Sequence, residues 1–248
     1  MAECAIVTGG SRGIGRAIVD RLLREGYNVV TCGRGARPVD LPDPVFWVTA
    51  DVSKTAEAAG LIKAASDRFG RVTLLVNNAG VQVEKTVADS GDDDWELVMN
   101  VNCKGVFNMC RAALPDMSEH GGNIVNIGSI SGVVADPSMA LYNASKAFVH
   151  GLTRSIAVDH GPKVRCNAIR PGWIMTEMAV DAFALANDPE RAMADALARH
   201  PVGRLGTPED VANVVAWLAS DQSDYVNGTC VTVDGGMTAA SPLNPGLF

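Results

Sequence analysis

The chain has 248 residues, of which 47% are hydrophobic and 20% charged, and its formal net charge at pH 7 is −7. This composition is ordinary for a globular protein, and a chain of this length can bury roughly 75% of its unfolded surface. The negative charge argues against a surface built for nucleic acid or anionic lipid, because both require a basic face. We therefore expect a small-molecule partner, with no nucleic acid and no membrane.

The spacing of cysteines and histidines indicates neither disulfides nor a metal site. The six cysteines form no CxxC pair, and the four histidines show no HExxH spacing. We expect buried, reduced thiols and no bound metal. The first apolar strand begins within five residues of Met1, and no apolar run approaches ~20 residues. A cytoplasmic protein is the expectation.

Short apolar strands alternate with amphipathic helices along the first half. Strands are expected at 2–7, 28–32, 45–50 and 72–76. A glycine-rich turn and a helix follow the first strand, and a second helix covers 58–69. Residues 33–44 hold too many glycines and prolines for the helix that would normally stand there. The second crossover is therefore expected to be abbreviated.

The second half continues the alternation. Helices are expected from about 93 to 117 and over 139–160, with strands at 123–127, 164–169 and 229–233. Thr207 followed by Pro208 is a helix start. Residues 173–206 look irregular and are a candidate lid, because loops of this length in compact domains are usually functional.

This order of elements predicts an α/β fold. Strands joined by helices with short connections pair in parallel, and right-handed crossovers place helices on both faces of one doubly wound sheet of about seven strands. Without an internal repeat or a linker, residues 1–248 are expected to form a single domain, with the lid at 173–206 and a tail at 237–248.

A glycine-rich turn from Thr8 to Gly15 separates the first strand from its helix. Backbone N–H groups and the helix dipole can hold a pyrophosphate there, and glycine allows the close approach of phosphate oxygens. A plain tight turn is the alternative. The strand before it and the helix after it favour a dinucleotide site.

Tyr142 and Lys146 lie four residues apart on an expected helix and therefore share one face. A nearby ammonium favours phenolate, which is expected to lower the pKa of Tyr142 toward the range of a general acid and base. This spacing alone is also common on surfaces. Ser129 follows a strand at the sheet edge that binds ligands, and its hydroxyl can hold a substrate oxygen beside the phenol.

These motifs resemble those of the short-chain dehydrogenase/reductase family over nearly the whole chain. Residues 8–15 match its TGxxxGxG signature, residues 77–80 its NNAG motif, and Tyr142 and Lys146 its YxxxK with an upstream serine. Asn102 is similar to the asparagine of the family's tetrad. Asn100 is a competitor that spacing alone does not exclude, and the resemblance favours Asn102.

The resemblance implies a Rossmann-like fold and a set of site residues. The implied catalytic residues are Asn102, Ser129, Tyr142 and Lys146. The implied cofactor-binding residues are Gly9, Ser11, Arg12, Gly13, Ile14, Gly15, Arg34, Asp51, Val52, Asn78, Ala79, Gly80, Tyr142, Lys146, Pro171, Gly172, Ile174 and Thr176. In this scheme Lys146 holds a ribose hydroxyl, and Asn102 orders a water that links Lys146 to solvent.

The charge after the second strand distinguishes between nicotinamide cofactors. An NAD ribose favours a carboxylate at this point, whereas a 2′-phosphate favours arginine. Arg34 follows the strand, no acid occurs before Asp40, and Arg12 adds a second cation. NADP(H) is the predicted cofactor, with two solvated surface arginines as the alternative interpretation.

The implied activity is an oxidoreductase that interconverts a ketone or aldehyde and an alcohol, chiefly a secondary one. Ser129 and Tyr142 are expected to donate hydrogen bonds to the carbonyl oxygen. A 3-oxoacyl-(acyl-carrier-protein) reductase is one alternative, although residues 118–123 lack the lysine or arginine that would attract an acidic carrier. An NAD-dependent sugar or alcohol dehydrogenase is another. The complete set of reacting residues disfavours a non-enzymatic dinucleotide sensor.

Two further expectations concern the pocket wall and assembly. An apolar wall for the substrate is suggested by Val133, Met139, Trp173, Met178 and Phe183. The resemblance implies a homotetramer, or a dimer. The tail at 237–248 is expected to reach a neighbouring subunit's lid, with a frayed terminus as the alternative.

Overall fold

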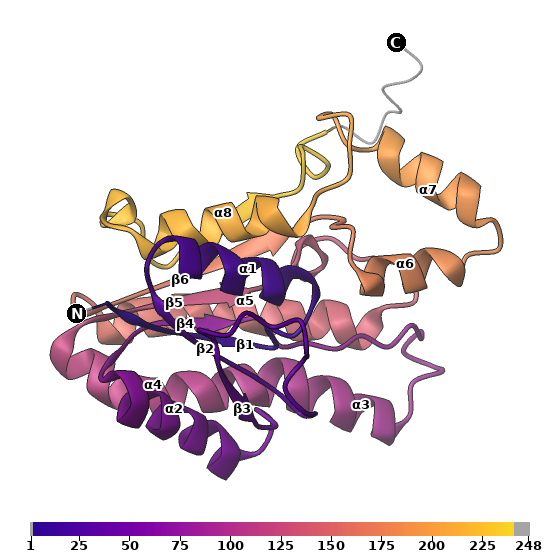
Figure 1. Cartoon of the computed structure of the whole chain (residues 1–248). Coiled ribbons are helices and arrows are strands. Elements are labelled where there is room, and N and C mark those ends of the chain that lie inside the picture. Colours follow the sequence, from indigo (N-terminus) through magenta and orange to yellow (C-terminus); the bar gives the residue numbers. More distant parts are fainter. Residues whose placement is uncertain (1, 241–248) are drawn as a thin grey trace.

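The computed structural model describes residues 2–240, and these form one seven-stranded parallel sheet with helices on both faces (Figure 1). The strand order is β3-β2-β1-β4-β5-β6-β7. The strands are β1 (Cys4–Thr8), β2 (Asn28–Gly33), β3 (Phe46–Thr49), β4 (Val72–Asn77), β5 (Gly122–Ile127), β6 (Val164–Pro171) and β7 (Cys230–Val233). The predicted doubly wound α/β fold is confirmed, and the strand order reverses between β1 and β4.

Each face of the sheet has its own apolar core. The helices are α1 (Gly13–Arg24), α2 (Thr55–Phe69), α3 (Asp92–Val98), α4 (Val106–His120), α5 (Ala140–His160), α6 (Glu177–Ala184), α7 (Pro189–Ala198) and α8 (Pro208–Ala219). Fully buried Leu22 of α1 and Leu218 of α8 belong to one core, and Leu61 of α2 and Met109 of α4 belong to the other. Burying each such side chain stabilises the fold by about 1.5–3 kcal/mol.

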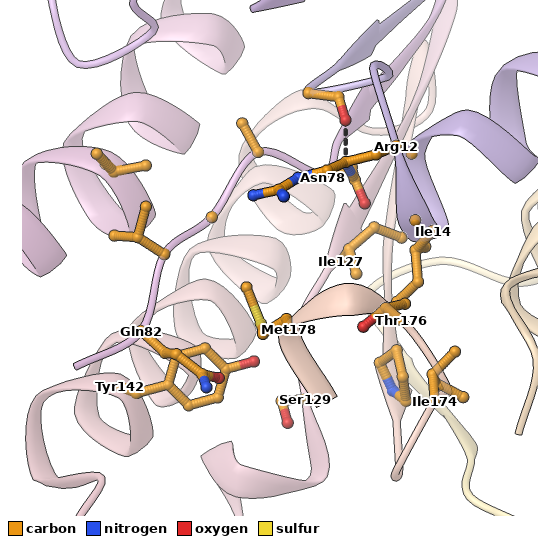
Figure 2. Close-up of a pocket in the computed structure, with 18 of the residues that line it drawn as sticks. Arg12, Ile14, Asn78, Gln82, Ile127, Ser129, Tyr142, Ile174, Thr176 and Met178 are labelled. Atoms are coloured by element: carbon orange, nitrogen blue, oxygen red, sulfur yellow. Dashed lines mark hydrogen bonds between the residues drawn. The ribbon is translucent and has the colours of Figure 1, made fainter. Parts of the chain in front are cut away.

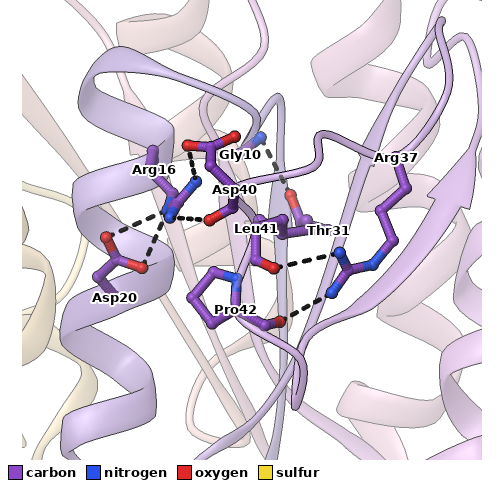
Figure 3. Close-up of polar contacts among 8 residues, drawn as sticks. All are labelled: Gly10, Arg16, Asp20, Thr31, Arg37, Asp40, Leu41 and Pro42. Carbon is purple, nitrogen blue, oxygen red and sulfur yellow. Dashed lines mark hydrogen bonds and ion pairs between the residues drawn. The ribbon is translucent and has the colours of Figure 1, made fainter.

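The crossover from β2 to β3 contains no helix, in agreement with the abbreviated crossover predicted from the sequence. Hydrogen bonds from arginines hold this segment in place (Figure 3). From α1, Arg16 donates to the carboxylate of Asp40 at 2.9 Å and to its backbone oxygen at 2.6 Å. Arg37 donates to the backbone oxygens of Leu41 and Pro42 at 3.1 and 2.9 Å. Leu41 is buried beneath these contacts. The irregular segment that begins at Arg34 is therefore well anchored.

Two segments differ from expectation. The long helix predicted over 93–117 is interrupted by a π-helix, Met99–Gly105, between α3 and α4. The lid at 173–206 contains α6 and α7, although the sequence suggested an irregular stretch. Thr176 accepts a hydrogen bond from the Ala179 backbone at the start of α6, and Asp188 accepts one from Arg191 at the start of α7. These caps satisfy N–H groups that a helix start leaves free.

The cysteines match the expectation of reduced thiols: all six are free, and five are buried. Among residues 2–240, every helix is too short or too polar to cross a bilayer. The part of the predicted tail at 241–248 lies outside the described residues.

Candidate active site

One cleft runs along the carboxyl ends of the strands. Its volume is about 540 Å³, and it spans the glycine turn, the ends of β2, β4, β5 and β6, and the first turn of α6. All of the predicted cofactor-binding residues line it. Ligands of doubly wound sheets bind at this edge, where the strand order reverses.

The glycine turn has the geometry of an anion cradle. Gly9 and Gly13 have φ values of +69° and +55°, a left-handed region that glycine enters without strain. A Cβ on Gly15 would lie 2.3 Å from the Gly9 carbonyl oxygen, so only glycine allows the turn to close this tightly. The first turn of α1 has no acidic residue. These features fit a dinucleotide pyrophosphate.

Asn78 fastens the glycine turn to the end of β4. Its side-chain amide donates to the backbone oxygens of Thr8 and Gly9 at 2.9 and 3.2 Å. In return the Thr8 hydroxyl accepts hydrogen bonds from the backbone N–H groups of Asn78 and Ala79, both at 3.0 Å. Next to it, buried Asn77 donates to Asn126 on β5 at 2.8 Å. The segment that matches the NNAG motif thus ties β1, β4 and β5 together.

Tyr142, Lys146 and Ser129 gather on the floor of the cleft. Figure 2 shows Ser129 near the Tyr142 hydroxyl, in the cleft that Gln82 also lines. The Lys146 ammonium is 5.4 Å from the centre of the Tyr142 ring and donates to the Ile127 backbone oxygen at 2.9 Å. The helical spacing of Tyr142 and Lys146 therefore brings both heads to one place.

The expected lowering of the Tyr142 pKa by Lys146 is wrong for this structure. Burial raises the pKa of the Tyr142 phenol to about 12, a hydrogen bond with Ser129 lowers it, and the charge of Asp136 raises it. Burial also lowers the pKa of Lys146 to about 8. Desolvation dominates both groups, so the neutral phenol is the resting form at neutral pH.

Asn102 lies behind this floor, within the π-helix. Its amide oxygen accepts from the Val81 backbone N–H at 2.8 Å, and its amide nitrogen donates to the Val81 oxygen at 2.8 Å and to the Ser145 hydroxyl at 3.0 Å. A Cβ on Gly80 would lie 3.4 Å from the Asn102 oxygen and 3.7 Å from the Lys146 nitrogen. Asn102 and Lys146 therefore flank Gly80.

The sequence missed several residues of the cleft. Gln82, Ser131, Asp136 and Glu177 line it although no motif identified them. Arg12 forms an ion pair with Glu177 of α6, a contact between residues 165 positions apart that no local pattern could reveal.

The predicted apolar wall is correct in part. Met139, Trp173 and Met178 line the cleft. Val133 does not line it and is 59% exposed, and buried Phe183 stacks against Trp173 with ring centres 4.8 Å apart. Within residues 2–240, no cluster of three or more histidine, cysteine or acidic side chains could hold a metal ion.

Comparisons with known proteins agree with this geometry. A family model described as enoyl-(acyl carrier protein) reductase matches residues 9–238. The chain is 41% identical to 2-(S)-hydroxypropyl-CoM dehydrogenase 3 of Xanthobacter autotrophicus, covering 96% of this chain and 97% of that protein. It is 37% identical to the NADP-dependent (R)-specific alcohol dehydrogenase of Lentilactobacillus kefiri, with coverage of 96% and 97%.

Two more relatives point the same way. The 3-oxoacyl-(acyl-carrier-protein) reductase of Thermotoga maritima is 36% identical, with 95% of this chain and 97% of the relative covered. The solved structure of Thermoplasma acidophilum aldohexose dehydrogenase superposes with a TM-score of 0.92 at 32% identity, covering 98% of this chain and 96% of that one. The chain therefore belongs to the short-chain dehydrogenase/reductase family and is an oxidoreductase of that type.

Proposed function

We propose that this protein is an NADP(H)-dependent oxidoreductase that interconverts a ketone or aldehyde and an alcohol, chiefly a secondary one. The observation that carries the proposal is the shared cleft, which Tyr142, Ser129 and Lys146 line together with the glycine turn. NADP(H) is favoured because Arg12 and Arg34 both line this cleft. The name of the Lentilactobacillus kefiri relative, an NADP-dependent alcohol dehydrogenase, supports this choice.

The chain's own residues suffice to hold such a cofactor. The glycine turn and the start of α1 would bind its pyrophosphate, and Arg12 and Arg34 its 2′-phosphate. Asp51 and Val52 would lie against the adenine, and Thr176 at the start of α6 against the carboxamide. When bound, the nicotinamide would supply or accept the hydride.

Tyr142 is the proposed general acid and base. As a neutral phenol it can donate its proton to a carbonyl oxygen, to which the Ser129 hydroxyl also donates once its hydrogen rotates away from Ser131. Lys146, whose ammonium lies 5.4 Å from the centre of the Tyr142 ring, is proposed to hold a ribose hydroxyl of the cofactor. In alcohol oxidation the phenolate accepts the proton instead. Asn102 is proposed to order a water between Lys146 and solvent.

A carrier-bound 3-oxoacyl substrate is the second candidate, since the Thermotoga maritima relative is named for that reaction. The charge argument raised against it from residues 118–123 does not hold. These residues end α4 and begin β5, at the amino end of that strand and therefore opposite the cleft. Their charge has no bearing on how a carrier would reach the site.

Assembly as a homotetramer or dimer is proposed on the basis of a second, mostly apolar groove. It lies between α4 and α5 and includes Phe107, Leu114, Leu152 and Ile156. Phe107 is 42% exposed in the single chain, which a neighbouring copy would cover. Light scattering of the wild type and of Phe107→Asp measures this directly.

The activity itself is tested with a panel of ketones and alcohols followed by NADPH absorbance. Tyr142→Phe should lower turnover at least about a hundredfold, because general acid and base catalysis supplies this much. NADPH binding, followed by fluorescence, should stay nearly unchanged in that variant because the ring is kept. Lys146→Met should weaken both binding and turnover. Substantial activity in Tyr142→Phe would contradict the assignment of Tyr142.

A further inference from the structure

A chain of hydrogen bonds connects Ser129 to a carboxylate. Ser129 donates from its hydroxyl to the Ser131 hydroxyl at 2.9 Å, and Ser131 donates to Asp136 Oδ2 at 2.6 Å. The Ser131 backbone N–H also donates to Ser129 Oγ at 3.1 Å. Both serines are buried. The Asp136 carboxylate is therefore only two hydrogen bonds away from the hydroxyl that lies beside Tyr142.

Asp136 is held in this position by its surroundings. Its backbone oxygen accepts from the side-chain amide of Asn143, in the first turn of α5, at 3.0 Å. Two residues later Ser138 has a φ of +55°, a left-handed conformation that non-glycine residues adopt at some cost and that the surrounding structure must enforce. Asp136 is half-buried and lines the cleft. A freely moving surface carboxylate would show none of these restraints.

Asp136 also lacks a cationic partner. No salt bridge within residues 2–240 includes it. The cations of the cleft are engaged or distant: Arg12 is paired with Glu177, and Lys146 donates to a backbone oxygen. Arg34 lies at the opposite end, after β2.

Gln82, Met139, Trp173 and Met178 also line the cleft, and none of these side chains carries a charge that could pair with Asp136. The negative charge of Asp136 is felt at the reacting centre, since it raises the pKa of Tyr142. A half-buried carboxylate with one oxygen bonded to Ser131 can still accept hydrogen bonds from a donor in the cleft.

We propose that Asp136 determines specificity by binding a protonated amine of the substrate, so that amino alcohols and amino ketones are preferred over neutral and anionic ones. This inference rests on the proposed function. An ammonium group near the reacting carbon donates to the Asp136 carboxylate while the substrate oxygen lies at Ser129 and Tyr142. An anionic group at the same place meets like charge and is rejected.

The test uses a matched pair of alcohols, 1-amino-2-propanol and 2-butanol, in which an ammonium replaces a methyl group. At pH 7.5 with NADP⁺, wild-type kcat/KM should be about ten- to a hundredfold higher for the amino alcohol, as a charge-assisted hydrogen bond allows. Lactate should be the poorest substrate. Asp136→Asn keeps an oxygen for Ser131 and should abolish the preference. Glu190→Gln, on the far helix α7, should leave it unchanged.

A second readout separates charge from mere folding. With 2-butanol, the pH profile of oxidation should shift to lower pH in Asp136→Asn, because the charge that raises the Tyr142 pKa is gone. Turnover of 2-butanol without preference for the amine would overturn the inference and leave the proposed function standing. Retention of the preference in Asp136→Asn would also overturn it. Failure of the wild type to oxidise either alcohol would contradict the proposed function, and the inference with it.

Discussion

Arg12 of the glycine turn and Glu177 of α6 form an ion pair across the mouth of the cleft. Both side chains are well exposed, at 72% and 64%. The same two segments also touch beside the pair, where a Cβ on Gly13 would lie 3.4 Å from the Thr176 methyl group. The lid therefore contacts the turn that is proposed to hold the cofactor phosphates. Glu177 is paired with Arg12, one of the two arginines proposed to bind the 2′-phosphate.

Glu177→Gln is expected to tighten NADPH binding, because Arg12 no longer divides its charge between the lid and the cofactor. Exposed ion pairs contribute about 0–1 kcal/mol, so the dissociation constant should fall by up to about fivefold. Fluorescence titration with NADPH and NADH measures the effect, which should be confined to NADPH. Glu190→Gln on α7 is the control. Equal changes for both cofactors would show that Glu177 acts on something other than the phosphate.

Arg34→Ala is expected to reduce the preference for NADPH over NADH by about ten- to a hundredfold, since it removes one charge-assisted hydrogen bond. The ratio of kcat/KM for the two cofactors is the measurement. Arg37→Ala is the matched control, because Arg37 donates to Leu41 and Pro42 in the same loop and does not line the cleft. A wild-type enzyme that used NADH equally well would rule out the assignment.

Thr31→Val is expected to lower the free energy of unfolding by about 1–3 kcal/mol. The buried Thr31 hydroxyl accepts from the Gly10 backbone N–H at 3.0 Å and donates to the Val7 oxygen at 2.6 Å (Figure 3 shows Gly10 beside Thr31). Valine keeps the shape and leaves the Gly10 N–H without this acceptor. Urea unfolding gives the loss. Thr73→Val is the control. The Thr73 hydroxyl makes longer hydrogen bonds, at 3.3 and 3.4 Å, so its removal should lower the free energy of unfolding much less.

His150 is expected to make stability depend on pH. Burial, followed by the charge of Arg170, lowers its pKa from 6.5 to about 4, and its ring fills the space between Gly128 and Gly132. Between those pH values the unfolded chain binds more protons than the native protein, so stability falls as the pH drops. From pH 7 to pH 5 this amounts to about 2 kcal/mol.

Urea unfolding at the two pH values checks this, with His150→Phe as the variant that cannot be protonated. Its loss of stability between pH 7 and pH 5 should be smaller by that amount, whatever its stability at pH 7. An unchanged dependence in His150→Phe would mean that other groups govern it.

The sequence was sufficient for the sheet because each strand is a short apolar run between breakers, and this pattern depends only on neighbouring residues. The prediction of an irregular lid was wrong, although the sequence contains a signal for one of its helices. Asp188 followed by Pro189 is the same start signal as Thr207 followed by Pro208, and it does begin a helix. The π-helix at 99–105 was beyond reach, because hydrophobic spacing does not reveal a local change of helix type.

The same distinction between local patterns and long-range contacts holds for the candidate site. Residues within one motif, such as Tyr142 and Lys146, could be placed together from their spacing. Asp136 could not, because its importance arises from the hydrogen bonds through Ser131 to Ser129. A sequence gives no signal for such contacts unless the loop between strand and helix is already known in three dimensions.

The π-helix that carries Asn102 has a consequence for how this enzyme can evolve. Each π turn holds more residues than an α turn and is less favourable, so deletion of one residue would let residues 92–120 wind as regular α-helix. Residues beyond the deletion would keep their helical faces, because the π turn accommodates the surplus residue, whereas residues within the turn would change direction. Selection for thermal tolerance alone would favour that deletion, and it would carry Asn102 away from Val81 and Ser145. Selection for activity therefore has to retain the π-helix, although its loss would make the protein more stable.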